Sequence, residues 1–380
     1  MIRILYIARY HNSLMERKIE LMAGQPDLAF WLVRPSRWQD DYGRIDVPVA
    51  PTEAYHTLRI PLLGRPDDPH RALYRTMTFG MRAARPDIIQ AEEEPDSLAA
   101  LQIALARRLF APGAKLVLYS WQNVNRPKRW EVRWVMQRTL RASDAVLCAN
   151  REAMEVLRQH GYRRQMRVVP AIGVDTRVFS PGPARPAGQG PFVIGYVGRL
   201  VAEKGLDTLL AALSHLKQTS GDNLANPVSL LIVGGGPYRA VLERQVRDEC
   251  LGDSVTFTSA RAPAQVAELM RQMDVLVLPS RRTSVWKEQF GRVLVEAMAC
   301  KVPVVASDSG AIPEVVGEAG LLFPEGDAVA LASCLRRLME SPALRQGLAA
   351  QGYTRTMSLY TQERIADQTA QFYRHMIAER

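Results

Sequence analysis

The chain has 380 residues, which is too long for one ordinary hydrophobic core and indicates two domains. Hydrophobic residues make up 47% and charged residues 23%, a composition typical of a soluble globular protein and not of a disordered one. The formal net charge is +10, and residues 1–182 hold most of it, with 28 Lys and Arg against 19 Asp and Glu. No apolar run approaches the roughly 18–20 residues of a membrane span, and no signal peptide is predicted.

The chain opens with the pattern of a βαβ unit. Residues 2–8 form the first predicted strand and residues 29–33 the second, with a helix over about 14–23 between them. The loop after the first strand contains Arg9 and His11, which can donate hydrogen bonds to an anion. His11 is equally compatible with an ordinary surface position.

An acidic cluster follows the next predicted strand, residues 86–90, and precedes an apolar helix over 98–109. The cluster lies at a strand end, where open α/β sheets bind their ligands. Two interpretations remain open. Glu94 contributes to an acceptor-binding site, or the cluster is a solvated loop in which Asp96 or Ser97 caps the helix.

The following strand ends in a polar stretch that contains Gln122 and Asn123. Amides can hydrogen-bond hydroxyl groups, but an amide cannot act as a general base.

Residues 126–141 combine six Lys or Arg with Trp130 and Trp134, which share one helical face. A basic helix of this kind can lie on an anionic membrane surface, or it can pack Trp inward and solvate its Arg side chains. We favour inward packing for the two Trp and a functional role for the charge.

A Pro- and Gly-rich stretch, residues 181–191, is the best candidate for a domain linker. The second domain then opens with a strand over 192–197. This strand leads into Gly198, where the backbone can approach a ligand closely. Arg199 and Lys204 place two cations on this strand-to-helix loop, where a diphosphate would lie.

Two carboxylates, Glu288 and Glu296, lie between predicted strands at 275–278 and 302–307. Apolar residues recur at helical spacing from about position 290, so Glu288 precedes this helix and Glu296 lies in its first two turns. Glu296 stands among buried residue types, and it therefore needs polar partners, which ligand hydroxyls would supply.

The start of this helix is a predicted anion site, because its first backbone N–H groups have no partner within the helix. These groups belong to Gly291, Arg292 and Val293, directly after Phe290.

Residues 288–299, EQFGRVLVEAMA, resemble the Glu–seven–Glu signature of the retaining family-four glycosyltransferases, which have the GT-B fold. The run G-R-x-x-x-E-K-G at 198–205 resembles the diphosphate clamp of that family. The resemblance implies an α/β fold of two Rossmann-like, doubly wound parallel-sheet domains that face a cleft. It is strong over residues 192–324 and weak over the first domain.

The family pattern implies roles for particular residues. Glu288 would contact the donor sugar, Glu296 the ribose, and Arg199 and Lys204 the diphosphate. The nucleotide base would lie near Arg261. Further nucleotide contacts are expected at Gly198, Phe290, Gly291, Arg292 and Val293.

The first domain departs from the family at two points. The glycine pair that usually follows the first strand is replaced by residues 9–13, and a histidine near the donor sugar is replaced by Gln122 and Asn123. Candidate acceptor residues are therefore Arg9, His11, Glu94, Gln122 and Asn123.

We predict an acceptor-binding domain over 1–182, a nucleotide-sugar-binding domain over 183–360, and a helix over 361–380 that crosses back to the first domain. The predicted activity is retaining transfer of a sugar from a nucleoside diphosphate sugar to a hydroxyl acceptor, with Glu288, Arg199 and Lys204 as catalytic residues. No metal and no resident cofactor are expected. The alternatives are a sugar-nucleotide epimerase and a non-catalytic partner subunit that binds sugar nucleotides.

The expected partners are a nucleoside diphosphate sugar and a saccharide or lipid-linked acceptor of envelope, capsule or glycolipid synthesis. An anionic membrane surface is a further candidate, from the basic first domain. No nucleic-acid-binding motif is present. The expected location is the cytoplasm, with peripheral attachment to the inner face of the cytoplasmic membrane as the membrane hypothesis.

Overall fold

The chain, seen here in a computed structural model, is described over residues 1–10, 16–40, 43–46, 54–64, 68, 72–183, 190–220 and 227–379. It divides into two units, one of residues 1–172 with 362–380 and one of residues 173–361. The candidate residue His11 and most of the predicted linker lie outside the described residues.

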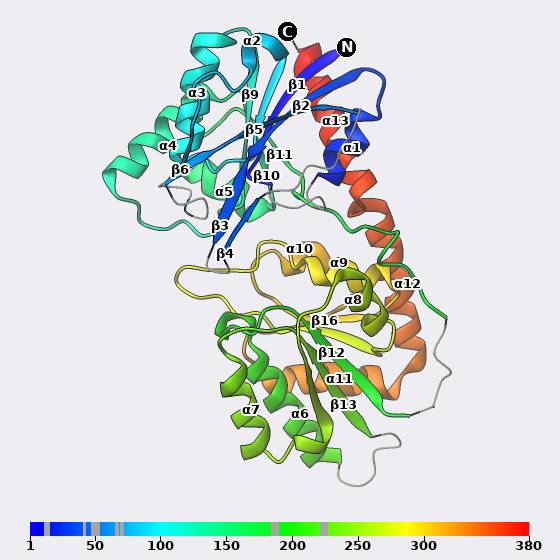
Figure 1. Cartoon of the computed structure of the whole chain (residues 1–380). Helices are drawn as coiled ribbons and strands as arrows, with labels where there is room; N and C mark the ends of the chain where they lie inside the picture. Colours follow the sequence, from blue (N-terminus) through cyan, green and yellow to red (C-terminus); the bar gives the residue numbers. More distant parts are fainter. Residues whose placement is uncertain are drawn as a thin grey trace. The chain divides into compact units, whose positions relative to one another are not determined.

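The first unit is built on a seven-stranded parallel sheet, in the order β11-β10-β9-β8-β1-β2-β5 (Figure 1). Its strands are β1 (Ile2–Ile7), β2 (Leu28–Pro35), β5 (His56–Ile60), β8 (Ile88–Ala91), β9 (Lys115–Ser120), β10 (Ala145–Cys148) and β11 (Gln165–Val168). Along β1, Leu5 and Ile7 enter one core and Ile4 and Tyr6 the other, because successive side chains leave opposite faces of a strand. Both faces of the sheet are therefore covered.

Helices form the two outer layers of this unit. One face carries α2 (Met81–Ala84), α3 (Leu98–Phe110), α4 (Trp130–Ala142) and α5 (Arg151–Gln159), and the other carries α1 (Arg17–Ala23) and α13 (Gln362–Ala378). The final helix joins this unit from the end of the chain. Arg374 of α13 fixes it by two contacts to Asp27, with Nε at 2.7 Å from Oδ2 and Nη2 at 2.8 Å from Oδ1.

Two short antiparallel hairpins and β5 lie between positions 34 and 85, where the sequence predicted no elements. The hairpins pair β3 (Arg37–Asp40) with β4 (Gly43–Asp46) and β6 (Leu62–Gly64) with β7 (Ala72–Tyr74). These hairpins interrupt the predicted alternation of parallel strands and helices in the first unit.

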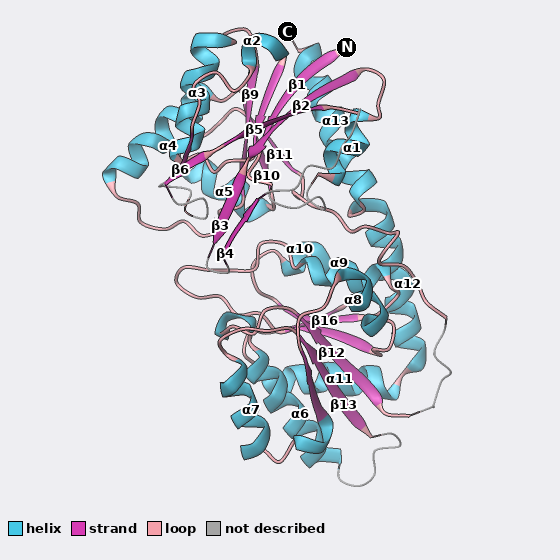
Figure 2. Cartoon of the chain, in the orientation of Figure 1, coloured by secondary structure: helices cyan, strands magenta, loops and turns pink. Residues whose placement is uncertain are grey.

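The second unit is a six-stranded parallel sheet in the order β14-β13-β12-β15-β16-β17 (Figure 2). Its strands are β12 (Phe192–Val197), β13 (Val228–Val233), β14 (Val255–Thr258), β15 (Val275–Leu278), β16 (Val304–Ser307) and β17 (Leu321–Phe323). The predicted strands at 192–197 and 275–278 are confirmed with these bounds. The prediction for 302–307 begins two residues before β16.

Helices cover both faces of this second sheet. They are α6 (Leu206–Ser220), α7 (Arg239–Asp248), α8 (Pro263–Met270), α9 (Arg292–Ala299), α10 (Ile312–Val316), α11 (Ala328–Glu340) and α12 (Pro342–Leu359). α11 packs on α6, and α12 packs on α9. Short 3-10 turns precede α6 and β14, at η2 (Ala202–Lys204) and η4 (Gly252–Ser254).

The first unit ends at Ile172, before the predicted boundary at 182. The reason is that the segment after it packs into the second unit. The backbone N–H of Val174 donates to the Tyr360 carbonyl at 2.8 Å, and Phe179 is buried in the second core.

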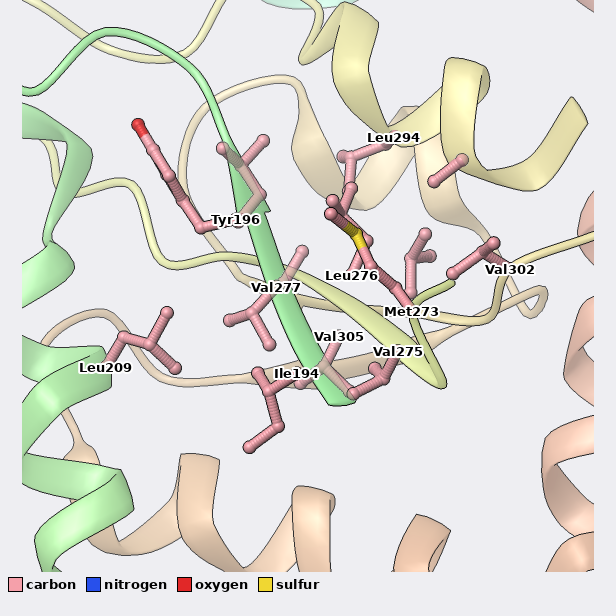
Figure 3. Packing of buried hydrophobic residues seen from close by; sticks show 14 of the residues in the cluster. Ile194, Tyr196, Leu209, Met273, Val275, Leu276, Val277, Leu294, Val302 and Val305 are labelled. Carbon is pink, nitrogen blue, oxygen red and sulfur yellow. The ribbon is translucent and has the colours of Figure 1, made fainter. Parts of the chain in front are cut away.

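Packing at the centre of the second unit is close (Figure 3). Ile194 and Tyr196 of β12 lie in one core with Val275 and Val277 of β15. A Cβ at the intervening Gly195 would lie 1.9 Å from the sulfur of Met273, so a side chain there would displace that of Met273. This packing holds β12 and β15 side by side and fixes the spacing of the loops that leave their carboxyl ends.

Candidate functional site

The order of strands reverses between β12 and β15, which are neighbours in the sheet although two strands separate them in the chain. In open α/β sheets the loops that diverge at such a point form the ligand site. The loop after β12 carries Gly198, Arg199 and Lys204, and the loop after β15 carries Glu288. The predicted donor residues therefore meet at the carboxyl edge of this sheet.

Lys204 and Glu288 form an ion pair across this point. The Lys204 Nζ lies 2.5 Å from Glu288 Oε2, and Ser280 Oγ donates to the same oxygen at 2.9 Å. Only 15% of the Lys204 side chain and 9% of the Glu288 side chain are exposed. Because burial of two charges costs hydration energy, the added hydrogen bond from Ser280 matters to the stability of this arrangement.

Two glycines let the backbones of the site approach one another. Gly205 has φ +66°, and a Cβ there would lie 2.0 Å from the carbonyl oxygen of Pro279. Gly310 has φ +54°, and a Cβ there would lie 2.3 Å from the carbonyl oxygen of Glu288. That same carbonyl accepts from the Ala311 N–H at 3.0 Å. Both glycines are in the left-handed region that other residues rarely adopt, so the backbone of Glu288 is fixed by its neighbours.

The helix α9 begins at Arg292 with Gly291 as its N-cap, which confirms the predicted start. Gly291 has φ +71°. Glu288 precedes the helix and Glu296 lies inside it, as expected. Val293 is half-buried.

Glu296 is buried, with Oε1 at 2.9 Å from the Nε of Arg292. Burial raises the pKa of Glu296, and the charge of Arg292 opposes that rise. The Arg292 side chain is 60% exposed. Glu296 is buried as expected, and its partner in the structure is Arg292, so its contact with ligand hydroxyls stays a prediction.

The other predicted nucleotide residues have different settings. Arg199 is exposed on the loop after β12, and Arg261 is exposed on the loop after β14, at the same edge of the sheet. Beside Gly198, the hydroxyl of Tyr196 donates to the Arg199 carbonyl at 2.8 Å. Phe290 is half-buried and contacts Tyr360 edge to face, with ring centroids 5.6 Å apart.

The first sheet has its own reversal, between β1 and β8, and an ion pair spans it too. Arg9 follows β1 and Glu93 follows β8. Their two contacts, Nε to Oε1 and Nη2 to Oε2, are both 2.7 Å. Burial raises the pKa of Glu93, and Arg9 opposes that rise. Of the predicted acceptor residues, Arg9 is thus held by Glu93.

The remaining described acceptor candidates also form hydrogen bonds within the first unit. Glu94 accepts from Ser120 Oγ at 2.9 Å and from the backbone N–H of Trp121 at 2.5 Å and of Gln122 at 3.1 Å. Burial, with Asp96 nearby, raises the pKa of Glu94 to about 8. The structure brings Glu94 and Gln122 together.

Two more amide contacts complete this group. The Gln122 Nε2 donates to Asp96 at 2.9 Å, and the Asn123 Nδ2 donates to Glu152 at 3.1 Å. The acidic cluster is buried, so the solvated-loop interpretation is wrong. Its capping part is confirmed, because the Ser97 hydroxyl accepts from the Ala100 N–H at 3.0 Å.

The preferred inward packing of the two Trp of α4 is wrong. Trp130 is 69% exposed and Trp134 is 47% exposed. The helix buries Val135, Met136, Thr139 and Leu140 instead. Either face satisfied the helical period, and the face with the smaller side chains is the one that is buried where α4 packs on α3.

Two searches of the described residues gave negative results. No group of three or more His, Cys, Asp and Glu is placed to hold a metal ion. None of the described helices combines the length and the apolar character needed to cross a bilayer.

Sequence reasoning missed Ser280 and Trp286. Ser280 was read only as the end of a strand. Trp286 lies in the loop before Glu288, and the Lys204 Nζ lies 4.9 Å from the centroid of its ring. An aromatic residue two positions before a candidate catalytic carboxylate was the available signal.

Family models match both halves of the chain. Residues 183–355 match the model described as glycosyl transferases group 1, and residues 20–171 match the one described as glycosyl transferase 4-like domain. Together the two matches include the loops after β8, β9, β12 and β15.

Curated relatives are similar over part of their length. A GDP-mannose-dependent alpha-(1-6)-phosphatidylinositol monomannoside mannosyltransferase of Mycolicibacterium smegmatis is 35% identical over 182 residues, 45% of this chain and 46% of the relative. An alpha-D-kanosaminyltransferase of Streptomyces kanamyceticus is 28% identical over 186 residues, 48% of this chain and 46% of the relative. The chain spans about half the length of the curated relatives it matches.

Solved structures are similar over the whole chain. A sucrose-phosphate synthase from Thermosynechococcus elongatus has a TM-score of 0.75 and 23% identity, with 100% of each chain covered. The Anabaena protein HepE in complex with UDP has a TM-score of 0.73 and 20% identity, with 98% of this chain and 100% of that chain covered. At these identities the likeness shows a common fold.

Proposed function

Since the chain belongs to the glycosyl transferases group 1 and has the GT-B fold of family four, we propose that it transfers a sugar from a nucleoside diphosphate sugar to a hydroxyl acceptor. The observation that carries the proposal is the Lys204–Glu288 pair at the strand reversal of the matched domain. Nothing in the site favours an epimerase or a non-catalytic subunit over a transferase.

The proposed donor contacts follow from charge. Arg199 and Lys204 bind the diphosphate, Glu296 the ribose hydroxyls, and Glu288 the transferred sugar. The Glu288 carboxylate now holds the place beside Lys204 that a phosphate oxygen would take. Donor binding therefore exchanges one anionic partner of Lys204 for another and leaves the ammonium paired throughout.

We propose the retaining outcome and independence from metal ions on the same grounds. Negative charge develops on the leaving diphosphate as the glycosidic bond breaks. Two cations and the N-terminus of α9 are the groups that offset it. If the acceptor attacks from the face of the leaving group, the phosphate takes the proton. Gln122 and Asn123 then need supply no base.

The first test measures ligand binding. Unfolding temperatures are recorded with UDP, GDP, ADP and their sugars, since a ligand at about 100 times its dissociation constant stabilises by roughly 2.7 kcal/mol. Lys204→Ala should reduce the shift. Lys217→Ala, an exposed lysine on α6, is the matched control and should keep it. If no nucleoside diphosphate raises the unfolding temperature of the wild type, the proposal fails.

The second test measures chemistry. Slow hydrolysis of the stabilising sugar nucleotide, followed by proton NMR of the released sugar, reports its anomeric configuration. Release of the opposite anomer would refute retention. A release rate that is unchanged in Glu288→Gln would remove Glu288 from the reaction.

We further propose that the acceptor is a saccharide or a lipid-linked saccharide met at an anionic membrane surface. The support is the outer face of α3 and α4, which pack side by side. Leu105 and Leu109 of α3 are 50% and 66% exposed, and Trp130 and Trp134 of α4 are exposed in the same helical layer. Exposed cations accompany the Trp, at Arg126, Arg129, Arg133, Arg138 and Arg141. Apolar and aromatic side chains with cations suit the headgroup region of an anionic bilayer.

One cation of this stretch does not belong to the surface. The Lys128 Nζ lies 2.5 Å from Asp96 Oδ2, and only 9% of its side chain is exposed. A fair test therefore leaves Lys128 in place.

Sedimentation with vesicles tests the surface. The wild type should pellet with anionic vesicles, less at raised salt, and remain soluble with neutral ones. The triple variant of Arg126, Arg129 and Arg133 to Ser should stay in the supernatant. A variant with three exposed cations changed elsewhere, at Lys217, Arg244 and Arg247, should pellet as the wild type does. A wild type that stays in solution with anionic vesicles at low salt removes the membrane from the proposal.

A further inference from the structure

The loop between β15 and α9 contains a compact turn that ends in Trp286. The Thr283 N–H donates to the Trp286 carbonyl at 2.8 Å, and the Val285 N–H donates to Thr283 Oγ1 at 3.2 Å. Val285 is 53% exposed, whereas the next residue, Trp286, is half-buried. The turn thus directs the aromatic side chain toward the protein and the aliphatic one to solvent.

The base of this loop is anchored on two sides. Arg281 reaches back to the start of α6, with Nη1 at 2.9 Å from Asp207 Oδ2 and Nη2 at 3.0 Å from the Ala202 carbonyl. Arg282 Nε lies 3.1 Å from Glu325 Oε2. The residues that lead into the turn are thus attached to the unit at two points, which limits the movement of the backbone that carries the indole.

The indole ring lies against the ammonium of Lys204. The Nζ lies 4.9 Å from the ring centroid and 2.5 Å from Glu288 Oε2. An aromatic face attracts a cation through its quadrupole, and the attraction grows as water is excluded. The ring carries no net charge, so it does not compete with an anion that approaches Lys204. Glu288 does compete.

This difference between the two partners of Lys204 leads to a role for Trp286. We propose that Trp286 is a positioning residue, whose ring holds the Lys204 ammonium in place while its anionic partner changes from Glu288 to the donor diphosphate. The inference rests on the proposed function, since it concerns how the donor site accepts its ligand. Without the ring, the Lys204 ammonium would stay with Glu288 or move into solvent. Its contact with the diphosphate would then be weaker.

Two substitutions separate the ring's quadrupole from its bulk. Trp286→Phe keeps an aromatic face, and Trp286→Leu keeps an apolar side chain without one. Calorimetry uses whichever of UDP, GDP and ADP stabilises the wild type most, with the corresponding monophosphate beside it. Trp286→Leu should weaken diphosphate binding about 5- to 30-fold, the range for a desolvated cation–π contact. Trp286→Phe should stay within about 3-fold, and Val285→Ala should equal the wild type.

A double-mutant cycle shows whether the ring acts through Lys204. If it does, the loss caused by Trp286→Leu disappears in the Lys204→Ala background. Monophosphate binding should be equal in the wild type and Trp286→Leu, which also shows that the variant is folded. Wild-type diphosphate affinity in Trp286→Leu overturns the inference. So does a loss shared equally by Phe and Leu, or one that persists without Lys204.

The outcome also separates this inference from the proposal on which it rests. A wild type that binds no nucleoside diphosphate overturns both. A wild type that binds one, with no preference between Leu and Phe at position 286, overturns only the role of Trp286.

Discussion

In each unit a cation–glutamate pair spans the reversal of the sheet, and in both pairs the partners are 84 positions apart in the chain. Arg9 and Glu93 form the first, with two parallel contacts of 2.7 Å. Lys204 and Glu288 form the second, with one contact of 2.5 Å. The same topology thus yields a two-point clamp in one unit and a one-point contact in the other.

The difference follows from the chemistry of the two cations. A guanidinium presents a rigid fork that matches a carboxylate, whereas an ammonium is a compact charge that rotates freely among acceptors. The first pair is also more enclosed, with 12% of Arg9 and 3% of Glu93 exposed. The clamp therefore suits a fixed structural role, and the ammonium pair suits an exchange of partners.

The neighbourhoods of the two pairs differ in the same direction. Glu92, next to Glu93, accepts from the Tyr6 hydroxyl and contacts the Lys18 Nζ at 2.7 Å. In the second unit Arg199 is exposed, and the Arg292 side chain is 60% exposed. The first reversal is closed by protein contacts, and the second presents cations to solvent.

The largest expected effect would break the first clamp. Glu93→Gln leaves the Arg9 charge buried without its carboxylate, which typically costs about 3–5 kcal/mol. We expect calorimetry to show a marked fall in the stability of the first unit, with nucleoside diphosphate binding to folded protein unchanged. An unfolding profile like that of the wild type would show that the clamp is dispensable.

The next effect concerns the second pair and its turnover. Glu288→Gln should lower the rate about 10²- to 10³-fold, the scale for a contact that strengthens in the transition state. Glu296→Gln should instead weaken donor binding, because an amide accepts the ribose hydroxyls less well than a carboxylate. Steady-state kinetics with the sugar nucleotide separates the two. Equal losses in KM alone for both variants would contradict this division.

A smaller effect is expected from the cations. Arg199→Ala and Lys204→Ala should each weaken nucleoside diphosphate binding by about 1.5–3 kcal/mol, the scale of hydrogen bonds to charged groups. Binding of the free nucleoside should hardly change, because neither side chain is expected to reach the base. Calorimetric titration decides, and wild-type affinity in both variants would end the clamp assignment.

Much of the second unit was predictable because its strands are short apolar runs that end at Gly, Pro or Ser. Leu278 is followed by Pro279 and Ser280, for example, and both the strand and its end were predicted. The loops that follow such strands meet at one edge of the sheet. The approach of Lys204 to Glu288 therefore follows from the fold once the strand order is known.

The segment between 34 and 85 was not predictable in this way. Strand β5 is largely half-exposed, and β6 is short and exposed, so neither forms an apolar run. The Arg9–Glu93 clamp was also missed. Arg9 was noted alone and Glu93 only within the acidic cluster, because an isolated Arg and one of three consecutive Glu carry no sign of which partner each will take.

The first unit predicts a pH effect that acts through Glu94. Burial raises the pKa of Glu94 to about 8. Folding therefore takes up a proton there. The stability that this proton contributes is complete below about pH 4 and is lost as pH rises through about 8.

The unfolding temperature of the first unit should fall between pH 5 and 8, because a rise of the Glu94 pKa from 4.5 to about 8 is worth a few kcal/mol over that range. Glu94→Gln, which does not titrate at this position, should make the profile less steep, and Glu93, whose pKa burial also raises, should keep a slope of the same sign. A slope equal to that of the wild type would assign the effect to another group.

The last prediction is that removal of divalent ions leaves the reaction rate unchanged. It tests whether the cations of the second unit replace a metal ion. A diphosphate leaving group carries negative charge that must be offset in the transition state. A glycosyltransferase without fixed cations at this position would need a divalent ion to do so. Here Arg199, Lys204 and the first turn of α9 supply positive charge from one edge of one sheet. We expect the rate of donor hydrolysis to be the same in saturating chelator as in added Mg²⁺ or Mn²⁺.

A second experiment compares the wild type with Lys204→Ala. If the Lys204 charge replaces that of a divalent ion, added Mg²⁺ should restore part of the lost hydrolysis rate in Lys204→Ala and leave the wild-type rate unchanged. If chelator abolishes the wild-type rate and a divalent ion restores it, the cations bind the diphosphate but do not stabilise the negative charge that develops on it in the transition state.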